Sequence, residues 1–201
     1  MIKIGIMGAP STGKTTLAKE LSIHLLYHKG KLAEYIDEYA RQFVARFGVP
    51  TIFDQYFFFE QQLKKERAVS PTTEYLVTDS PFYLSYIYGS KVMNRDSEKD
   101  RLYFHALVER LLEHVNDYDY VIYLPSSDGH LQADGMRIHT TVFDQQDVDE
   151  RIRGFFSIYN IHYHTVTGTL ADRIEKCCEI VGVDQAGNKR TLREGKEKTS
   201  G

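Results

Sequence analysis

A glycine-rich loop near the start of the chain constrains the fold more than any other stretch. Residues 8–15 read GAPSTGKT and match the pattern G-x-x-x-x-G-K-[ST]. The alternating apolar run of residues 2–7 predicts a strand before the loop, and residues 16–21 predict a helix after it. A strand, a glycine-rich turn and a helix N-terminus direct backbone N–H groups and the helix dipole at one point, where phosphate oxygens fit. Because the three parts occur in the required order, a phosphate site is favoured over a chance match in a turn.

The residues of this loop have predictable roles. Gly8 and Gly13 permit backbone angles and a close approach that a side chain would block. Lys14 is expected to reach the β- and γ-phosphates, and the Thr15 hydroxyl is expected to bind Mg²⁺. The other positions expected to contact the nucleotide are Ser11, Thr12 and Thr16.

A second nucleotide signal follows residues 75–78, an apolar run that predicts a strand and ends on Asp79. Downstream of a phosphate loop, such an aspartate holds the hydration shell of Mg²⁺ beside the loop threonine, here Thr15. The next residue is Ser80, where motor-type ATPases carry a second acid that activates water. Hydrolysis as the main activity is therefore disfavoured relative to phosphoryl transfer.

Asp37 and Glu38 form an acidic pair between a predicted strand over residues 32–36 and a predicted helix over residues 39–47. Open α/β sheets bind their ligands at the carboxyl ends of strands, so the pair is a candidate for a second ligand site. A helix N-terminus that favours acidic residues explains the pair equally well.

Aromatic residues and glutamines are concentrated in two later stretches. Residues 53–69 predict a helix with five aromatic rings, most of which are expected in the core and one or two of which could stack on a planar base. Gln61 and Gln62 could pair with the edge of a heterocycle, although a solvated helix face is favoured. Three tyrosines beside Asp79 fit an acceptor pocket and the core equally well, namely Tyr83, Tyr86 and Tyr88.

A long polar segment follows the fourth predicted strand and predicts a lid over about residues 126–153. Arginines on a lid can neutralise charge on a transferring phosphoryl group. The arginines in this part of the chain are Arg137, Arg151 and Arg153.

The chain of 201 residues is short enough for one domain, and its apolar share of 42% provides a full core. We expect that domain over residues 1–182 and a polar, basic, disordered tail over residues 183–201. Five predicted strands alternate with helices, which predicts a three-layer α/β/α sandwich around a mainly parallel sheet.

Charge and cysteine content exclude some function classes. A net charge of −3 gives no general reason to expect a nucleic-acid partner. Cys177 and Cys178 are adjacent and neighbouring cysteines rarely bridge each other, so a reducing cytoplasm is expected. No stretch approaches the roughly 20 apolar residues of a membrane span, and no signal peptide is predicted. No feature of the sequence predicts an oligomeric state.

Several motifs together point to one family. With GAPSTGKTT, IDEYARQF, VTDSPF, DGMR and TGTLADRI, residues 1 to about 182 resemble one branch of the P-loop kinases. That branch includes the ribosylnicotinamide kinase domain of bacterial NadR-type proteins and related AAA-labelled ATP-binding proteins. The phosphate loop alone is specific only for a nucleotide, whereas the EYAR element at 38–41 and the DGMR element at 134–137 are much more specific. The nucleotidyltransferase and DNA-binding domains of NadR-type proteins have no counterpart in this sequence, so the acceptor need not be nicotinamide riboside.

The resemblance implies roles for further residues. Asp37 or Glu38 would be the base or would orient the acceptor, and Glu38 matches the EYAR element. Arg41 would brace this carboxylate or contact phosphate. The resemblance also places Asp134 and Arg137 in the lid, and Gly168 and Thr169 near the adenine.

We therefore expect an ATP- and Mg²⁺-dependent phosphotransferase that acts on a small nucleoside-like acceptor. One alternative is a regulatory ATP-binding protein with little turnover. A GTPase is disfavoured, because the only Asn-Lys pair, at 188–189, lacks the aspartate of an N-K-x-D element. Another alternative is a polynucleotide 5′-kinase, which would need a basic groove for the strand.

Overall fold

A parallel sheet forms the centre of the protein, whose computed structural model describes residues 1–126 and 142–183, except for the side chains of residues 41, 42 and 142–144. The strands are β1 (Ile2–Gly8), β2 (Ala33–Ile36), β3 (Tyr75–Thr78), β4 (Tyr120–Leu124) and β5 (His164–Thr165). They form a five-stranded sheet in the order β2-β3-β1-β4-β5, and every neighbouring pair is parallel. The predicted fold class is confirmed.

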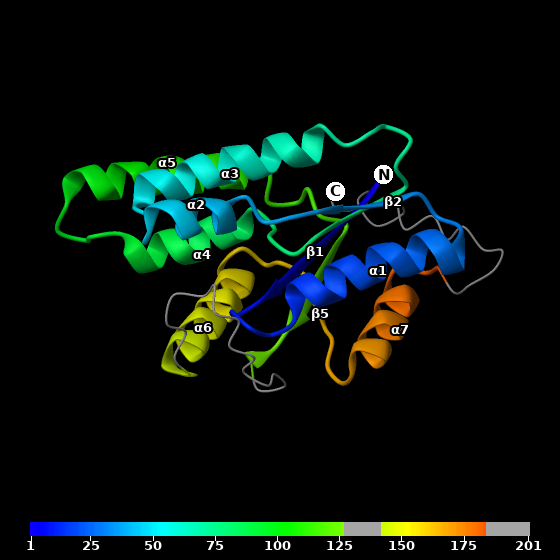
Figure 1. The fold of residues 1–201 in the computed structure, drawn as a ribbon. Helices are drawn as coiled ribbons and strands as arrows, with labels where there is room; N and C mark the ends of the chain where they lie inside the picture. The colour runs from blue at the N-terminus through cyan, green and yellow to red at the C-terminus, as the bar shows by residue number, and fades with distance from the viewer. Residues whose placement is uncertain (127–141, 184–201) are drawn as a thin grey trace, which may run out of the picture.

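Helices cover both faces of this sheet (Figure 1). They are α1 (Lys14–Lys29), α2 (Ala40–Phe47), α3 (Ile52–Arg67), α4 (Tyr83–Val92), α5 (Glu98–Leu112), α6 (Val142–Ile158) and α7 (Leu170–Ile180). On one face α1 and α7 pack on the strands through a cluster that includes Leu17, Leu21 and Cys177. On the other face α3, α4, α5 and α6 enclose a second cluster that includes Phe59, Ile87 and Ile152. The result is the three-layer sandwich expected from the alternation of strands and helices.

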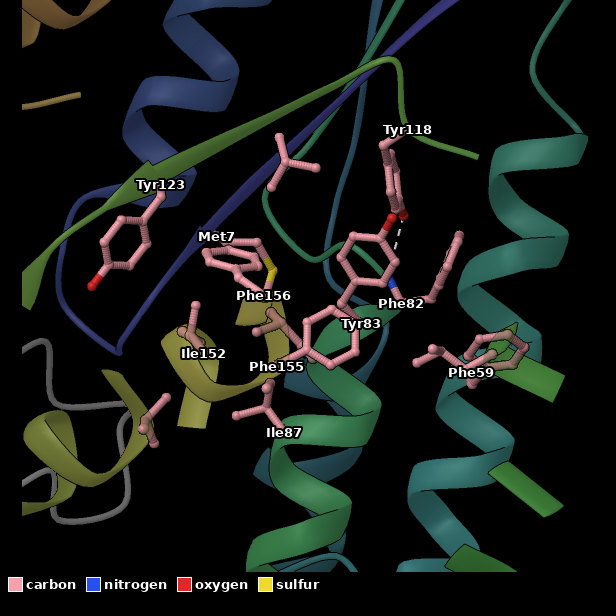
Figure 2. Packing of buried hydrophobic residues seen from close by; sticks show 14 of the residues in the cluster. Met7, Phe59, Phe82, Tyr83, Ile87, Tyr118, Tyr123, Ile152, Phe155 and Phe156 are labelled. Atoms are coloured by element: carbon pink, nitrogen blue, oxygen red, sulfur yellow. Dashed lines mark hydrogen bonds between the residues drawn. The ribbon is translucent and has the colours of Figure 1, made fainter. Parts of the chain in front are cut away.

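The second cluster is rich in aromatic rings (Figure 2). Tyr83 lies at its centre, 1% exposed, and its hydroxyl donates to the carbonyl oxygen of Val115. Burial raises the pKa of Tyr83 well above its ordinary value, and the negative charges of Asp117 and Glu66 add to this rise. Of the two positions predicted for Tyr83, the acceptor pocket and the core, the core is therefore the correct one.

The buried face of α3 carries most of the aromatic rings of the helix, as predicted. Phe58 and Phe59 are buried and Tyr56 packs against the core, whereas Phe53 and Phe57 are 54% and 38% exposed. Gln62 is only 3% exposed, so the favoured solvated position is wrong for this residue. The error arises because the helix places residues 55, 58, 59, 62, 63 and 66 inward, and this set mixes apolar and polar side chains.

Helix boundaries follow local capping. Thr51 and Asp54 form a reciprocal capping box, so α3 begins at Ile52. The Ser97 side chain accepts from the backbone N–H of Asp100, so α5 begins at Glu98.

Candidate active site

The phosphate loop has the geometry that its glycines predict. A Cβ on Gly8 would lie 2.7 Å from both the carbonyl oxygen of Leu124 and the hydroxyl of Thr12, which leaves no room for a side chain. Gly13 has a φ of +88° and precedes the first residue of α1. Ser11 also has a positive φ, of 65°. These angles turn the chain sharply between β1 and α1, so the amides of the loop and of the first helical turn lie around one point.

Two side chains from distant parts of the sequence hold this loop. Arg173 of α7 is 9% exposed and donates to the carbonyl oxygen of Thr12 at 2.8 Å and to that of Gly168 at 3.0 Å. Gln145 of α6 donates to the carbonyl oxygen of Pro10 at 2.6 Å. Sequence reasoning missed both residues, because a single arginine or glutamine on an amphipathic helix carries no signal of its tertiary partner.

Lys14, Thr15 and Asp79 meet at the start of α1. The Lys14 ammonium donates to the carbonyl oxygen of Ala9 at 2.8 Å, which keeps it over the loop. The Thr15 hydroxyl donates to Asp79 Oδ2 at 2.5 Å, so the two residues expected to share a metal ion are in direct contact. Thr16 is exposed in the same first turn of α1.

The chemistry of this pair fits Mg²⁺. Asp79 is 3% exposed, and its Oδ1 is buried without a hydrogen-bond partner in the part of the chain that the structure describes. A buried carboxylate oxygen without a donor is costly, and a hard cation with its water shell is a partner that satisfies it. Thr15 and Asp79 are therefore the residues that would hold the ion.

A hollow lies beside Asp79, between α3, α4 and the segment that follows β2. Glu38 and Tyr39 line one side, Gln55 and Gln62 of α3 line another, and Ser80 is part of the base. The remaining lining residues include the rings Phe58, Phe82 and Tyr88 and the hydroxyl of Ser85. The lining thus combines aromatic walls with several hydrogen-bonding groups, which is typical of sites for planar polar ligands.

The two acidic candidates have different surroundings. Glu38 lines the hollow. Asp37 is exposed and makes an ion pair with Lys65, whose ammonium also donates to the Asp37 carbonyl oxygen at 3.0 Å. Arg41 lies in the first turn of α2, and its side chain is outside the described residues.

The predicted lid divides into two parts. Residues 127–141, with Asp134 and Arg137, lie outside the described residues, as does the tail from residue 184. Residues 142–153 of the predicted lid belong to α6, whose Val148 and Ile152 are buried in the core. Arg151 is held by Asp147 and by the Ser90 hydroxyl, so it is committed to structural contacts.

Gly168 precedes α7 and has a φ of +95°. Its carbonyl oxygen accepts from Arg173, which also bonds to Thr12, so one guanidinium joins the loop after β5 to the phosphate loop. Thr169, the next residue, caps α7 through a reciprocal box with Asp172.

The family model described as an AAA domain matches residues 3–173, which is most of the chain. The chain belongs to this AAA domain family. The resemblance to AAA-labelled P-loop proteins is confirmed, and the AAA-domain match spans the phosphate loop, Asp79 and Arg173. A search of curated protein sequences finds no match.

Solved structures of P-loop kinases share the fold of this AAA domain. The NadR protein in complex with NR aligns with a TM-score of 0.70 at 18% identity, over 90% of this chain and 52% of that chain. The NadR protein in complex with NAD and AMP-PNP gives a TM-score of 0.69 at 16% identity, over 92% of this chain and 50% of that chain. The chain therefore spans about half the length of NadR.

A deoxyadenosine kinase from M. mycoides with products dCMP and dCDP bound is also similar. It gives a TM-score of 0.62 at 15% identity and covers 92% of this chain and 100% of that chain. At such identities the likeness concerns the fold.

Among the described residues, no helix is both long and apolar enough to cross a membrane.

Proposed function

We propose that the protein is an ATP- and Mg²⁺-dependent kinase of a small nucleoside-like acceptor. The observation that carries the proposal is the arrangement of three groups at one edge of the sheet. Strand β3 lies between β2 and β1, so Asp79 at its end separates the Glu38 hollow from the phosphate loop. A donor phosphate on the loop would therefore face an acceptor in the hollow across the metal-binding aspartate.

Each residue would contribute a distinct part of the transfer. The loop amides and Lys14 would bind the β- and γ-phosphates. Mg²⁺, held by Thr15 and Asp79, would neutralise charge on these phosphates. Glu38 would accept the proton of the acceptor hydroxyl as its oxygen bonds to the γ-phosphorus. The bond from the γ-phosphorus to the β–γ bridging oxygen would break, and ADP would leave with that oxygen.

Within the described lining of the hollow, the charged residue is Glu38. The other lining residues carry amides, hydroxyls or apolar side chains. A phosphate monoester would be repelled by Glu38, whereas a neutral or cationic nucleoside would not. The lining thus favours nucleosides over nucleoside monophosphates as acceptors.

The direct test is acceptor-dependent ADP release by the purified full chain with ATP and MgCl₂. The acceptor panel should contain adenosine, deoxyadenosine, cytidine, deoxycytidine, nicotinamide riboside and the corresponding monophosphates. We expect turnover with one or more nucleosides, slower turnover with their monophosphates, and loss of turnover in Lys14→Met. ADP release that no acceptor stimulates would overturn the proposal and would favour a regulatory ATP-binding protein.

A further inference from the structure

A row of buried polar side chains runs along the inward face of α3. Gln55, Gln62 and Glu66 are 4%, 3% and 0% exposed. Burying polar groups on a helix costs free energy unless each finds a partner, so the partners of these three residues are informative.

Glu66 has protein partners at both carboxylate oxygens. The hydroxyl of Tyr118 donates to Oε1 at 2.6 Å, and the Lys3 ammonium lies 3.4 Å from Oε2. The Tyr118 hydroxyl also accepts from the backbone N–H of Phe82 at 3.1 Å, the bond drawn as a dashed line in Figure 2. Burial raises the pKa of Glu66, and hydrogen bonds from Tyr118, Lys3 and Gln62 oppose that rise. Glu66 is therefore a fixed hydrogen-bond acceptor, one helical turn after Gln62.

Gln62 is held by one end of its amide. Its Nε2 donates to the Thr78 hydroxyl at 3.2 Å, and Glu66 accepts from the same amide. Thr78 and Glu66 both accept from this amide, so its nitrogen lies on their side. The Oε1 atom on the opposite side is buried and has no hydrogen-bond partner within the described residues.

Gln62 also lines the hollow beside Asp79, together with the rings of Tyr39, Phe58 and Tyr88. Aromatic walls suit a planar ring, and the edge of such a ring is the part that meets an in-plane amide oxygen. A ligand that carries a hydrogen-bond donor on that edge would satisfy the oxygen that the protein leaves unpaired.

We propose that Gln62 selects the acceptor: its Oε1 accepts a hydrogen bond from an amino or carboxamide N–H on the planar base of the nucleoside. Glu66 is the positioning residue that keeps the amide in this orientation. This proposal rests on the proposed kinase function and narrows its substrate class to nucleosides whose base carries such a donor.

The experiment compares acceptors that differ by one donor. Adenosine is paired with purine riboside, and nicotinamide riboside with 3-acetylpyridine riboside, in which a methyl group replaces the amide NH₂. A substrate that leaves a buried acceptor unpaired is rejected strongly, so we expect kcat/KM to fall roughly 10- to 100-fold without the donor. The comparison uses the wild-type chain and does not depend on the folding of any variant.

Variants then assign the effect to Gln62. In Gln62→Met, a substitution of similar length without hydrogen-bonding atoms, the two members of a pair should be used at rates within a few-fold of each other. The matched control is Gln61→Met, because Gln61 is the half-buried neighbour on the same helix and is not among the residues that line the hollow. This control should keep the full discrimination. In Glu66→Gln, the discrimination should fall partly, while the KM for ATP should stay near the wild-type value.

The outcomes separate this proposal from the kinase proposal. Turnover of nucleosides with equal use of both members of each pair would overturn the role of Gln62 and leave the kinase function intact. The role of Gln62 would also be overturned if Gln62→Met and Gln61→Met retained the discrimination equally. It would be overturned as well if Gln62→Met changed the use of 2′- or 3′-deoxyadenosine relative to adenosine, since Gln62 would then act on a sugar hydroxyl.

If no acceptor is turned over, the equilibrium binding of the two acceptors of each pair, measured by calorimetry, still decides the question. A donor preference that Gln62→Met abolishes supports the proposal, and equal or absent binding overturns it.

Discussion

At the scale of single residues, the two carboxylates after β2, those of Asp37 and Glu38, have different surroundings. Lys65 binds Asp37 through both its backbone carbonyl and its carboxylate, whereas Glu38 lines the hollow beside Asp79. A general base must reach the proton that it removes, so position in the hollow matters more than acidity at this edge of the sheet. We therefore propose Glu38, and not Asp37, as the base.

Replacement of each carboxylate by its amide tests this assignment. Glu38→Gln should lower kcat by about 10²- to 10⁴-fold, the range for loss of a general base, with little change in the KM for ATP. Asp37→Asn should change kcat less than about 10-fold, because it removes only a surface ion pair. Steady-state rates of ADP release with the best acceptor provide the measurement. A larger loss of kcat in Asp37→Asn than in Glu38→Gln would reverse the assignment.

Sequence reasoning succeeded for the backbone around Lys14, which is set by the local chain. The strand, loop and helix around Lys14 follow one another directly, so their backbone geometry is encoded within residues 2–21. It failed for Gln62, because burial of an amide depends on Thr78 and Glu66, and no periodic pattern distinguishes such a residue from a solvated one. A buried glutamine and a solvated glutamine give the same sequence pattern along a helix, and only their tertiary contacts distinguish them.

At the scale of elements, α7 does more than cover the sheet. It carries Arg173, whose guanidinium bonds to backbone carbonyls of Thr12 and Gly168. A Cβ on Gly13 would lie 3.2 Å from the same guanidinium, so the loop and the arginine are closely packed. The shape of the phosphate loop therefore depends on a helix more than 150 residues away in the sequence.

We expect Arg173→Met to weaken the binding of ATP by roughly 10-fold or more, because the carbonyl groups of Thr12 and Gly168 lose a charged donor and the loop is no longer fixed. Lys176→Met on the same helix is the control, since Lys176 is exposed and pairs only with Glu179 among the contacts described for it. Calorimetric titration with a non-hydrolysable ATP analogue measures both affinities. Equal affinities in the two variants would show that the guanidinium does not support the loop.

The N-terminus of α7 has its own pH dependence. Hydrogen bonds from the side chain and the backbone N–H of Thr169 lower the pKa of Asp172 below its ordinary value of 3.8. A lowered pKa in the folded state means that the carboxylate stabilises the fold above pH 3.8, and that this stabilisation is lost as the pH falls through the lowered pKa.

Urea unfolding of the wild type and of Asp172→Asn tests this cap. The wild type should be the more stable of the two at about pH 6, and the difference should shrink as the pH falls below 3.8 and through the lowered pKa, where the carboxylate becomes protonated. Subtracting the variant removes the contributions of other titrating groups. A difference that stays constant over this pH range would contradict the assignment of the capping bond to the ionised carboxylate.

At the scale of the whole molecule, the alternation of strands and helices was sufficient to predict the layers and the parallel sheet. The order of the strands was not encoded in the same way, because β3 inserts between β1 and β2, and no local pattern reports that pairing. This insertion is what brings Asp79 between the phosphate loop and Glu38. The candidate site could thus be proposed from the sequence as a set of residues, but the hollow between α3 and α4 required the fold.

The two cysteines report on the integrity of the whole fold. Cys177 and Cys178 are buried between α7 and the sheet, and burial raises the pKa of Cys177 to about 12. The thiolate is the form that reacts with alkylating reagents, so both burial and the raised pKa protect Cys177 in the native state. Modification should therefore require that the packing of α7 on the sheet opens.

We expect iodoacetamide at about pH 8 to label neither cysteine in the native protein and both in urea. If labelling proceeds through global unfolding, a ligand that binds only the folded state slows it by a factor of about 1 + [L]/Kd, so an ATP analogue at 100 times its Kd should slow labelling about 100-fold. Intact-mass spectrometry over time gives the rates. A rate that the ATP analogue and sub-denaturing urea both leave unchanged would show that α7 opens locally, without release of the phosphate loop that Arg173 ties to it.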